Sequence, residues 1–267
     1  MKLYECSLVI RGGGDLASGI AYRLFKSGFR PLILELPQPR MVRASVSFGT
    51  AVYDGSVVVE GVKAVRIDSM PENCEYLDYI PICVDEHGEM LSSLKPHILV
   101  DARMLKRHGC SSREAADFVI GIGPGFCAGV DVHVVIETNR GADLGRIYET
   151  GMAQADTGVP GIVAGKGKER VLRSESDGII KHHMSLGDVA KEGQVIASVG
   201  SSNIRAPFEG KIRGLISEGL LVKRGEKIGD IDPRIDIDYC KISDKARAIG
   251  GGVLEAILSH FEFEISI

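Results

Sequence analysis

Three side chains with acid–base chemistry stand close together in one apolar stretch of the chain. Asp131, His133 and Glu137 are separated by valine and isoleucine residues. Successive side chains of a strand point to opposite faces, so a strand over 130–136 would place these three, with Asn139 beyond it, on one face. Neighbours two apart lie roughly 7 Å from each other, which allows Asp131 and His133 to share a water or ligand. We predict that Asp131, His133 and Glu137 are catalytic, although the solvated face of a half-buried strand would show the same alternation.

The loop just before this stretch is rich in glycine. Residues 121–129 contain four glycines and one proline, and the backbone N–H groups of such a loop can surround an anion or a carbonyl group. The loop follows an apolar run, which is where ligands bind in open α/β sheets. The predicted ligand contacts in this region are Gly123, Gly125, Asn139 and Arg140. Cys127 in the loop is either a reactive thiolate or a small packing residue.

A second glycine turn lies near the start of the chain. Residues 8–35 read as strand, glycine turn, helix and strand, which is the opening of a dinucleotide-binding fold. Glu35 follows Gly14 by 21 residues, where a carboxylate can bind a ribose hydroxyl. The predicted contacts are Gly12, Gly13, Gly14, Asp15, Ala17 and Glu35. Asp15 argues against a phosphate, because its carboxylate can cap the helix N-terminus and repel an anion. A bound nucleotide and a similar fold with another ligand therefore both stay open.

Three further charged residues follow predicted strands. Asp101 comes after the apolar run 97–100, where it can face a ligand at the edge of a sheet or cap a helix. Arg40 and Arg43, in the loop after Glu35, could hold the phosphate that Asp15 would repel, or could simply be solvated.

The elements that must position these residues are short apolar runs separated by turn signals. The runs lie at 56–59, 62–67, 80–84, 97–100, 118–122 and 130–136, with a helical stretch at 111–117. Strands mixed with helices in this way predict an α/β domain over residues 1–165. With 267 residues, 44% of them apolar, the chain is long enough for two domains with their own cores.

The pattern of glycines and apolar runs changes after residue 165. Residues 178–197 and 210–229 each read as glycine, strand, a seven-residue step that begins and ends with glycine and contains a valine (187–193 and 219–225), and strand. This pattern resembles the biotinyl/lipoyl, or barrel-sandwich hybrid, domain, here expected over 170–235. The tip between the halves, 200–203, has no lysine to modify, so the resemblance implies a module for docking or for shaping a cleft rather than a swinging arm.

The tail, residues 240–267, is predicted to form a helix that starts after Ser243 and a short strand through Phe261, Phe263 and Ile265. Three consecutive glycines at 250–252 would weaken an isolated helix, so we expect them to mark close packing on the first domain. The predicted fold class is α/β: a Rossmann-like N-terminal domain, an all-β barrel-sandwich hybrid domain, and a C-terminal helix that packs back.

Composition narrows the classes of partner. A net charge of −4 with both signs interspersed gives no general attraction to nucleic acid or to anionic membranes. The start of the chain lacks the apolar core of a signal peptide, and we found no apolar stretch long enough to span a membrane, so a cytoplasmic location is expected. Six scattered cysteines without a C-x-x-C pair predict reduced thiols and no metal site.

Several segments together resemble one known family. These are Arg11–Leu24, Val119–Gly141, Asp156–Gly161, the lysine-less module and Ser243–Arg247. They look like the YqeB-like maturation, or accessory, proteins of selenium-dependent molybdenum hydroxylases. The first domain is also similar to that of xanthine dehydrogenase accessory proteins.

The resemblance implies a factor that binds or inserts the molybdenum cofactor or its selenium-modified form. The implied ligand is a molybdopterin dinucleotide, and the implied partners are a molybdenum hydroxylase apoprotein, other maturation factors and a second copy of the chain. An NAD(P)-dependent oxidoreductase that uses Asp131, His133 and Glu137 is one alternative. A non-catalytic interaction scaffold is the other, and whether any reaction is catalysed stays open.

Overall fold

The chain forms two compact units. A computed structural model describes residues 2–69, 77–105, 112–156 and 158–263. Unit 1 takes its described residues from Met1–Pro39, Ser47–Asp156 and Ile242–Ile267, and unit 2 from Arg40–Val46 and Thr157–Lys241. Each unit has its own core and is described separately.

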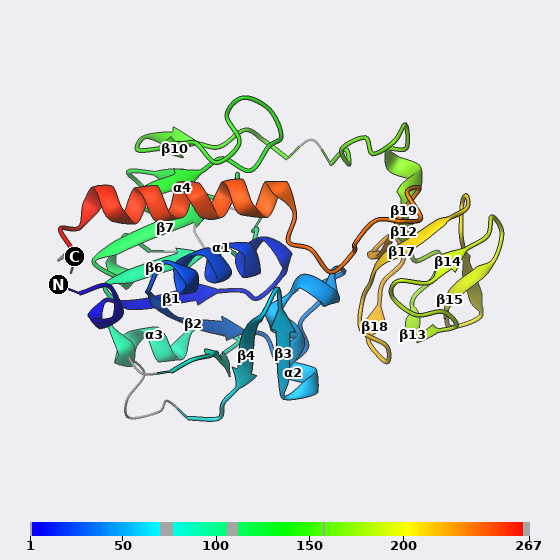
Figure 1. Cartoon of the computed structure of the whole chain (residues 1–267), viewed down its shortest axis with the longest axis horizontal. Coiled ribbons are helices and arrows are strands. Elements are labelled where there is room, and N and C mark those ends of the chain that lie inside the picture. Colours follow the sequence, from blue (N-terminus) through cyan, green and yellow to red (C-terminus); the bar gives the residue numbers. More distant parts are fainter. Residues whose placement is uncertain (1, 70–76, 106–111, 157, 264–267) are drawn as a thin grey trace. The chain divides into compact units, whose positions relative to one another are not determined.

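Unit 1 is built on a nine-stranded mixed sheet with the order β10-β9-β7-β6-β1-β2-β5-β4-β3 (Figure 1). The seven strands from β9 to β4 run parallel, and β10 and β3 pair antiparallel at the two edges. The strands are β1 (Ser7–Arg11), β2 (Arg30–Glu35), β3 (Ser56–Val59), β4 (Val62–Arg66), β5 (Ile80–Val84), β6 (Ile98–Asp101), β7 (Phe118–Ile122), β9 (Val134–Ile136) and β10 (Ile147–Tyr148), with a separate pair of β8 (Cys127–Ala128) and β11 (Gly151–Met152). Strands β6, β7 and β9 are buried along their whole length, which explains their continuous apolar sequence.

Four α-helices belong to the described part of unit 1. They are α1 (Asp15–Lys26), α2 (Ala51–Asp54), α3 (Glu89–Leu94) and α4 (Asp244–His260), with 3₁₀ turns η1 (Leu3–Glu5), η3 (Phe48–Thr50) and η5 (Arg113–Ala115). Helix α1 packs on β1 and β2, and α4 packs on β9 and β10. These contacts bury the apolar side of each helix against the sheet.

Helices α1 and α4 lie side by side and run in the same direction (Figure 1). Gly19 of α1 lies against Ala246 near the start of α4 and against Gly250 one turn later. The guanidinium of Arg247 lies over the ring of Tyr22, 5.5 Å from its centroid. Because small residues allow the two backbones to approach, the N-termini of both helices come together at one end of the sheet.

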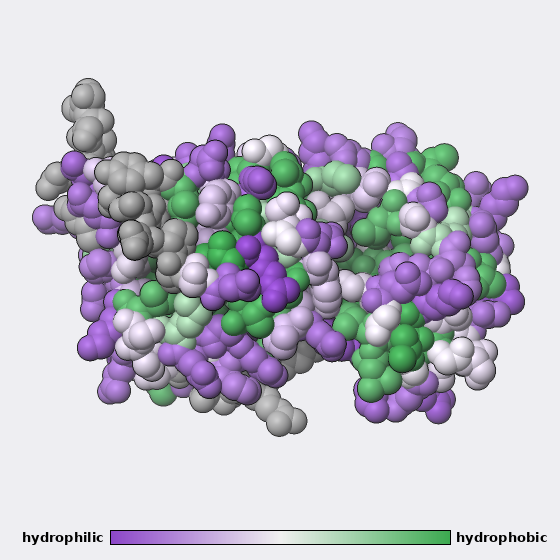
Figure 2. Space-filling view, turned by 90° about the horizontal axis from the view of Figure 1, so that it is seen from below, coloured by the Kyte–Doolittle hydropathy of each residue, from purple (hydrophilic) through white to green (hydrophobic). Residues whose placement is uncertain are grey.

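Unit 2 consists of two four-stranded antiparallel sheets, β12-β19-β17-β14 and β16-β15-β13-β18. Their strands are β12 (Val171–Arg173), β13 (Gly178–His182), β14 (Val189–Ala190), β15 (Val195–Val199), β16 (Ser202–Arg205), β17 (Gly210–Leu215), β18 (Leu221–Val222) and β19 (Lys227–Asp232), with 3₁₀ turns η2 (Ala44–Val46) and η6 (Lys168–Arg170). Aliphatic side chains from both sheets, such as Ile196, Ile212 and Ile231, form one core. On the face seen in Figure 2, hydrophilic and hydrophobic residues are interspersed.

The predicted fold class was wrong. The large sheet is mixed, unlike the sheet of the expected Rossmann-like domain, because the β3–β4 hairpin and β10 add antiparallel strands at both edges. In the described residues β7 and β9 are joined by the short strand β8 instead of a crossover helix. The second part is a pair of small antiparallel sheets, not the expected barrel-sandwich hybrid domain.

Local predictions also needed correction. The strand expected over 130–136 is only β9, Val134–Ile136, and the helix expected over 111–117 is the 3₁₀ turn η5. No strand includes Phe261 or Phe263, and Ile265 lies outside the described residues. In both segments the side chains follow a periodic pattern, but the backbone does not form the hydrogen bonds of a longer strand or helix. The N–H of Asp131, for example, donates to the carbonyl oxygen of Cys127 at 2.9 Å in a turn.

Candidate functional site

The carboxyl ends of four parallel strands in unit 1 bring separate sequence motifs to one edge. The backbone register sets Arg11 of β1 beside Asp101 of β6, and Asp101 beside Gly121 of β7. Ile122 of β7 pairs in turn with Ile136 of β9. The first glycine turn, Asp101, the glycine loop and Glu137 therefore follow neighbouring strands at the edge where ligands bind in open α/β sheets.

The first glycine turn is held by Glu35. Gly12 adopts a φ of 96°, which favours glycine. The N–H of Gly13 donates to Glu35 Oε1 at 2.8 Å, and the N–H of Leu36 donates to Glu35 Oε2 at 2.5 Å. Burial raises the pKa of Glu35, and these two hydrogen bonds oppose the shift. The carboxylate thus stabilises the turn, and it is not presented as a free acceptor for a ribose.

The other side of the turn is filled by protein. A Cβ on Gly13 would lie 2.8 Å from the backbone nitrogen of Gly49, whose N–H donates to Gly13 O at 2.8 Å. Gly14, in contrast, has open space where a Cβ would stand, and it precedes α1 without a side-chain cap. Ala17 is buried in α1, as a small packing position requires. The open part of this turn is therefore the start of α1, at Gly14 and Asp15.

Asp101 is fully buried and paired. Arg103 Nε and Nη2 donate to its two oxygens at 2.9 and 2.6 Å, in a bidentate ion pair. The charge of Asp101 is matched locally, and its role in the structure is to fix Arg103 at the strand end.

The glycine loop is packed with protein atoms at the positions predicted to contact a ligand. A Cβ on Gly125 would lie 2.0 Å from the carbonyl oxygen of Leu105, and one on Gly123 would lie 3.1 Å from Thr138 Oγ1. The N–H of Cys127 donates to Asp131 Oδ2 at 3.0 Å. These glycines allow close chain packing, and the hydrogen bond to Asp131 orients the loop.

The proposed catalytic residues do not share one face. Because β9 spans only three residues, His133 precedes its amino end and Glu137 follows its carboxyl end. Asp131 is bound to the Cys127 turn. His133 lines a hollow of about 690 Å³ with Phe118, Tyr148, Glu255 and His260, and it lines a second hollow of about 500 Å³ together with Asp131. The three side chains therefore do not lie along one strand face, because the chain turns on both sides of β9. Asp131 and His133 remain neighbours, and the catalytic role of the three residues stays a prediction.

His133 has a shifted pKa. Its Nδ1 accepts the N–H of Val119 at 2.9 Å, and burial lowers its pKa, assisted by the charges of Arg113 and His260. A lowered pKa in the folded state means that the unfolded chain binds the proton more tightly, so stability is lost as the pH falls through the unfolded value of about 6.5.

We expect His133→Asn to reduce the acid sensitivity of the fold. Asparagine keeps an acceptor near the Nδ1 position and cannot be protonated in this range. Between pH 7.5 and 5.5 the thermal midpoint of the wild type should fall more than that of the variant, as measured by circular dichroism. Equal falls in the two proteins would contradict this assignment.

Glu137 is a buried structural acceptor. Its side chain is 0% exposed, and its Oε1 accepts the N–H groups of Thr138 and Asn139, both at 2.6 Å. Its Oε2 accepts the N–H of Gln154 at 2.8 Å. The side chain of Asn139 also reaches Gln154, donating to its Oε1 at 2.7 Å. Glu137 therefore shapes the loop after β9 and joins it to residue 154.

Glu137→Gln should destabilise the fold by about 2 kcal/mol, because the amide offers one acceptor oxygen and turns an NH₂ group toward backbone donors. The exposed Glu255→Gln, which removes the same charge, should change stability by less than about 0.5 kcal/mol. Urea denaturation followed by circular dichroism measures both. An equal loss of stability in the two variants would show that the effect comes from the change in net charge alone.

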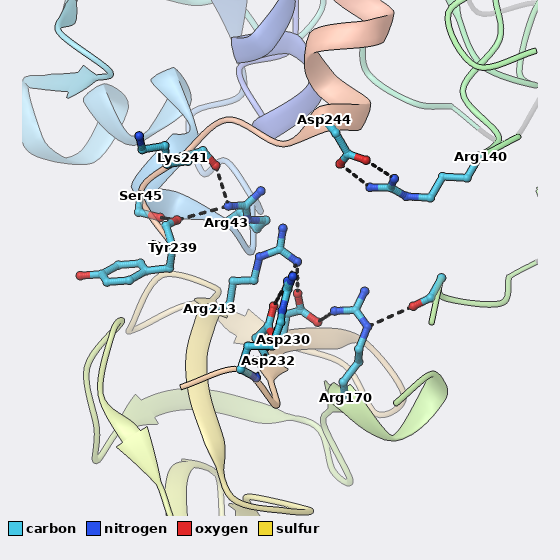
Figure 3. A network of polar contacts seen from close by, with 12 residues as sticks. Arg43, Ser45, Arg140, Arg170, Arg213, Asp230, Asp232, Tyr239, Lys241 and Asp244 are labelled. Carbon is cyan, nitrogen blue, oxygen red and sulfur yellow. Dashed lines mark hydrogen bonds and ion pairs between the residues drawn. The ribbon is translucent and has the colours of Figure 1, made fainter. Parts of the chain in front are cut away.

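The loop after β9 is connected to the start of α4. Arg140 Nη1 and Nη2 donate to the Asp244 carboxylate at 2.5 and 2.7 Å (Figure 3). The next residue, Lys245, is a partly buried amine in the first turn of α4. Burial lowers the pKa of Lys245; the charge of Arg140 adds to this, and Asp15, Asp156 and Glu137 oppose it.

Lys245 was missed in the prediction of site residues. A signal was present, because a lysine in the first turn of a helix opposes the helix dipole and is unusual there without a reason. Ser243 marks the helix start, and its Oγ accepts the N–H of Ala246 at 3.1 Å. The capping residue therefore locates Lys245 at the N-terminus from sequence alone.

Arg40 and Arg43 belong to unit 2 rather than to the glycine turn. Arg40 forms an ion pair with Glu226 at 2.6 Å. Arg43 Nη2 donates to the carbonyl groups of Tyr239 and Lys241 at 3.2 and 3.1 Å. Both arginines thus have protein partners in the second unit.

No helix in the described part of the chain is long and apolar enough to cross a membrane. No cluster of three or more His, Cys, Asp or Glu side chains in the same residues could hold a metal ion. The described cysteines Cys6, Cys83, Cys127 and Cys240 are not joined in disulfides, and burial raises the pKa of Cys6 to about 11.

Comparison with known proteins identifies a homologue. The chain is 47% identical over 254 residues to "Uncharacterized protein YqeB" of Escherichia coli (strain K12). The chain is a relative of YqeB. The alignment covers 94% of this chain and 47% of YqeB, so the chain spans about half the length of the curated relative. This supports the YqeB-like part of the family resemblance, and the name carries no activity. No protein-family model matches the chain.

Solved structures show only distant likeness. The ectoine utilization protein EutE (DoeB) from Ruegeria pomeroyi is 14% identical with a TM-score of 0.23, covering 85% of this chain and 53% of that one. An aspartoacylase family protein from Mesorhizobium loti is 13% identical with a TM-score of 0.24, covering 78% and 58%. A succinylglutamate desuccinylase from Silicibacter sp. TM1040 is 13% identical with a TM-score of 0.25, covering 85% and 86%. Similarity at this level assigns no activity to the YqeB relative.

Proposed function

We propose that this YqeB relative is an accessory factor for the maturation of selenium-dependent molybdenum hydroxylases, and that it binds the molybdenum cofactor or its selenium-modified form. The supporting observation is the convergence of separate motifs on one amine in unit 1. The charge of Lys245 interacts with Asp15, Glu137, Arg140 and Asp156. These residues lie in the segments that carry the family resemblance.

The charges at this edge match the parts of a molybdopterin dinucleotide. Helices α1 and α4 both begin here, so their N-terminal N–H groups and Lys245 offer positive charge to a pyrophosphate. The carboxylates of Asp15 and Asp156 can accept hydrogen bonds from the N–H groups of a pterin ring. Glu137 holds the loop in place and is not offered as a ligand contact. The residues present therefore fit the group, with Asp15 assigned to the pterin rather than to a phosphate.

In this proposal the protein binds the molybdenum cofactor and transfers it to the hydroxylase. The cofactor supplies any redox chemistry after its insertion. Lys245 and the start of α1 orient the anionic end of the ligand. The buried Asp101–Arg103 and Glu137 interactions keep the surrounding loops in one conformation. A hydroxylase apoprotein and other maturation factors are the partners. The nicotinamide-dependent alternative gains no support, because Glu137 lies beyond the carboxyl end of β9 from Asp131 and His133, and both of its oxygens accept backbone N–H groups.

Native mass spectrometry of the purified full chain tests this function. We expect a retained mass that corresponds to a pterin nucleotide, and a complex when an apo-hydroxylase is added. His133→Asn, at the opposite end of β9, should retain the same ligand. A tightly bound nucleotide without any pterin, together with no complex, would overturn the proposal.

A further inference from the structure

A hollow of about 690 Å³ lies at the amino ends of β7 and β9 in unit 1, and the proposed function does not use it. Phe118 and Val134, the first residues of these strands, line it together with Tyr148, which ends β10. The last turn of α4, next to the end marked C in Figure 1, forms another side through Ser259 and His260. This is the opposite edge of the sheet from the glycine turns, and the volume suits a small organic molecule.

One side of the hollow is apolar and aromatic. Phe118 and Val134 are buried, and Tyr148 is half-buried. The imidazole of His260 stacks on the ring of Phe118, with centroids 3.9 Å apart and planes inclined by 7°. The ring of Phe261 meets the same phenyl ring edge-on, with centroids 6.1 Å apart. These contacts hold the aromatic side chains in place, so the hollow offers a fixed apolar wall to a ligand.

The rim of the hollow is acidic. Glu149 and Glu255 both line it, and both are exposed. Neither carboxylate forms an ion pair or a side-chain hydrogen bond with any residue that the structure describes. The described residues that line the hollow include no lysine or arginine. The two negative charges of the rim are therefore available to a ligand.

The groups around the rim do not offset these charges. Helix α4 runs for 17 residues and ends at His260, so the carbonyl groups of its last turn place partial negative charge beside the hollow. His133 also lines the hollow, and burial, together with the charges of Arg113 and His260, lowers its pKa and favours the neutral imidazole. The guanidinium of Arg113 lines the second hollow of about 500 Å³, where it donates to the carbonyl oxygen of Gly129 at 2.9 Å. The hollow next to α4 is therefore negative overall.

We propose that this hollow binds an organic cation that consists of an ammonium group on an apolar or aromatic body. The two carboxylates and the C-terminus of α4 supply the negative charge that an ammonium ion requires, and the ring of Tyr148 adds a cation–π contact. The apolar wall at Phe118 and Val134 buries the body of the ligand. An anion would meet only negative charge at the rim. The site is separate from Lys245 at the other edge of the sheet, and its occupation does not depend on the proposed cofactor binding.

Isothermal titration calorimetry of the full chain with phenethylammonium chloride tests the site, at about pH 8, where imidazoles are ordinarily neutral. We expect saturable binding to one site per chain. Phenethyl alcohol, which has the same body without the charge, should bind about tenfold more weakly or not at all. Phenylacetate, which has the opposite charge, should show no saturable binding. All titrations use buffers of equal ionic strength, because salt screens exposed charges.

Variants of the rim test whether the two carboxylates hold the cation. Glu149→Gln and Glu255→Gln should each weaken binding of phenethylammonium about three- to fivefold, and the double variant about tenfold or more. Glu262→Gln is the matched control, because Glu262 is exposed just beyond α4 and does not line the hollow. It should bind like the wild type, and circular dichroism during heating checks that every variant is folded.

Three results would overturn the proposal. The first is no saturable binding of phenethylammonium to the wild type, and the second is equal binding of phenethyl alcohol. The third is an affinity in the double variant that matches the wild type. If Glu262→Gln weakened binding as much as the rim variants did, the attraction would come from net charge alone, and the assignment to this hollow would be wrong.

Discussion

Lys245→Met should lose the retained ligand almost completely while the chain stays as stable as the wild type or becomes more stable. A charged hydrogen bond to a phosphate in a partly buried site contributes about 1.5–3 kcal/mol, so its loss weakens binding roughly 10- to 100-fold. Burial lowers the pKa of Lys245, which means that the folded state disfavours the ammonium form relative to the unfolded chain. Replacing the amine with an apolar side chain of similar length removes this cost.

The opposite signs of the two effects make the result specific. Lys26→Met is the matched control, because Lys26 is exposed at the far end of α1 and loses the same charge. Retained ligand is measured by native mass spectrometry, and stability by circular dichroism during heating. If Lys245→Met keeps the ligand, or if it loses ligand only because it unfolds at a lower temperature, Lys245 is not a binding residue.

The residues at the carboxyl edge of the unit 1 sheet could be predicted from the sequence, because they follow local patterns of apolar residues. Apolar runs end at Arg11, Asp101 and Ile122, and parallel pairing then brings the following residues to one edge. The antiparallel pairing at the two edges of the sheet could not be predicted from the sequence. The β3–β4 hairpin and β10 have the same short apolar patterns as parallel strands, so their antiparallel pairing is decided by turns and contacts elsewhere.

Side-chain roles were harder to predict than positions. Glu35 is at the expected end of β2, but its acceptor capacity is directed to Gly13 and Leu36. Asp131 and His133 have the residue types of an acid–base pair, yet each binds a backbone N–H group. Spacing cannot distinguish an acceptor for a ligand from an acceptor for the protein's own backbone, because both use the same chemistry.

Gly252→Ala should destabilise the chain by about 3 kcal/mol, the largest stability effect that we expect from a single methyl group here. A Cβ at this position would lie 2.0 Å from the carbonyl oxygen of Gly145. Gly145 lies in a turn and has a φ of 83°. Its N–H donates to the carbonyl oxygen of Glu137 at 3.0 Å. The contact is therefore between two backbones, and neither a flexible side chain nor a rotamer change can relieve it.

Gly251→Ala provides a control of opposite sign one residue away. A Cβ there would meet only Arg23 Cζ, at 3.9 Å, so alanine fits and should stabilise the helix by about 0.5–1 kcal/mol. Urea denaturation followed by circular dichroism is suitable, because the chain has no tryptophan to report by fluorescence. If both variants were stabilised, α4 would not be held against the turn at Gly145, and the link from this helix through that turn to Glu137 would be lost. Opposite signs would show that consecutive glycines in α4 differ in purpose: one is required by close backbone contact, and the other is replaceable.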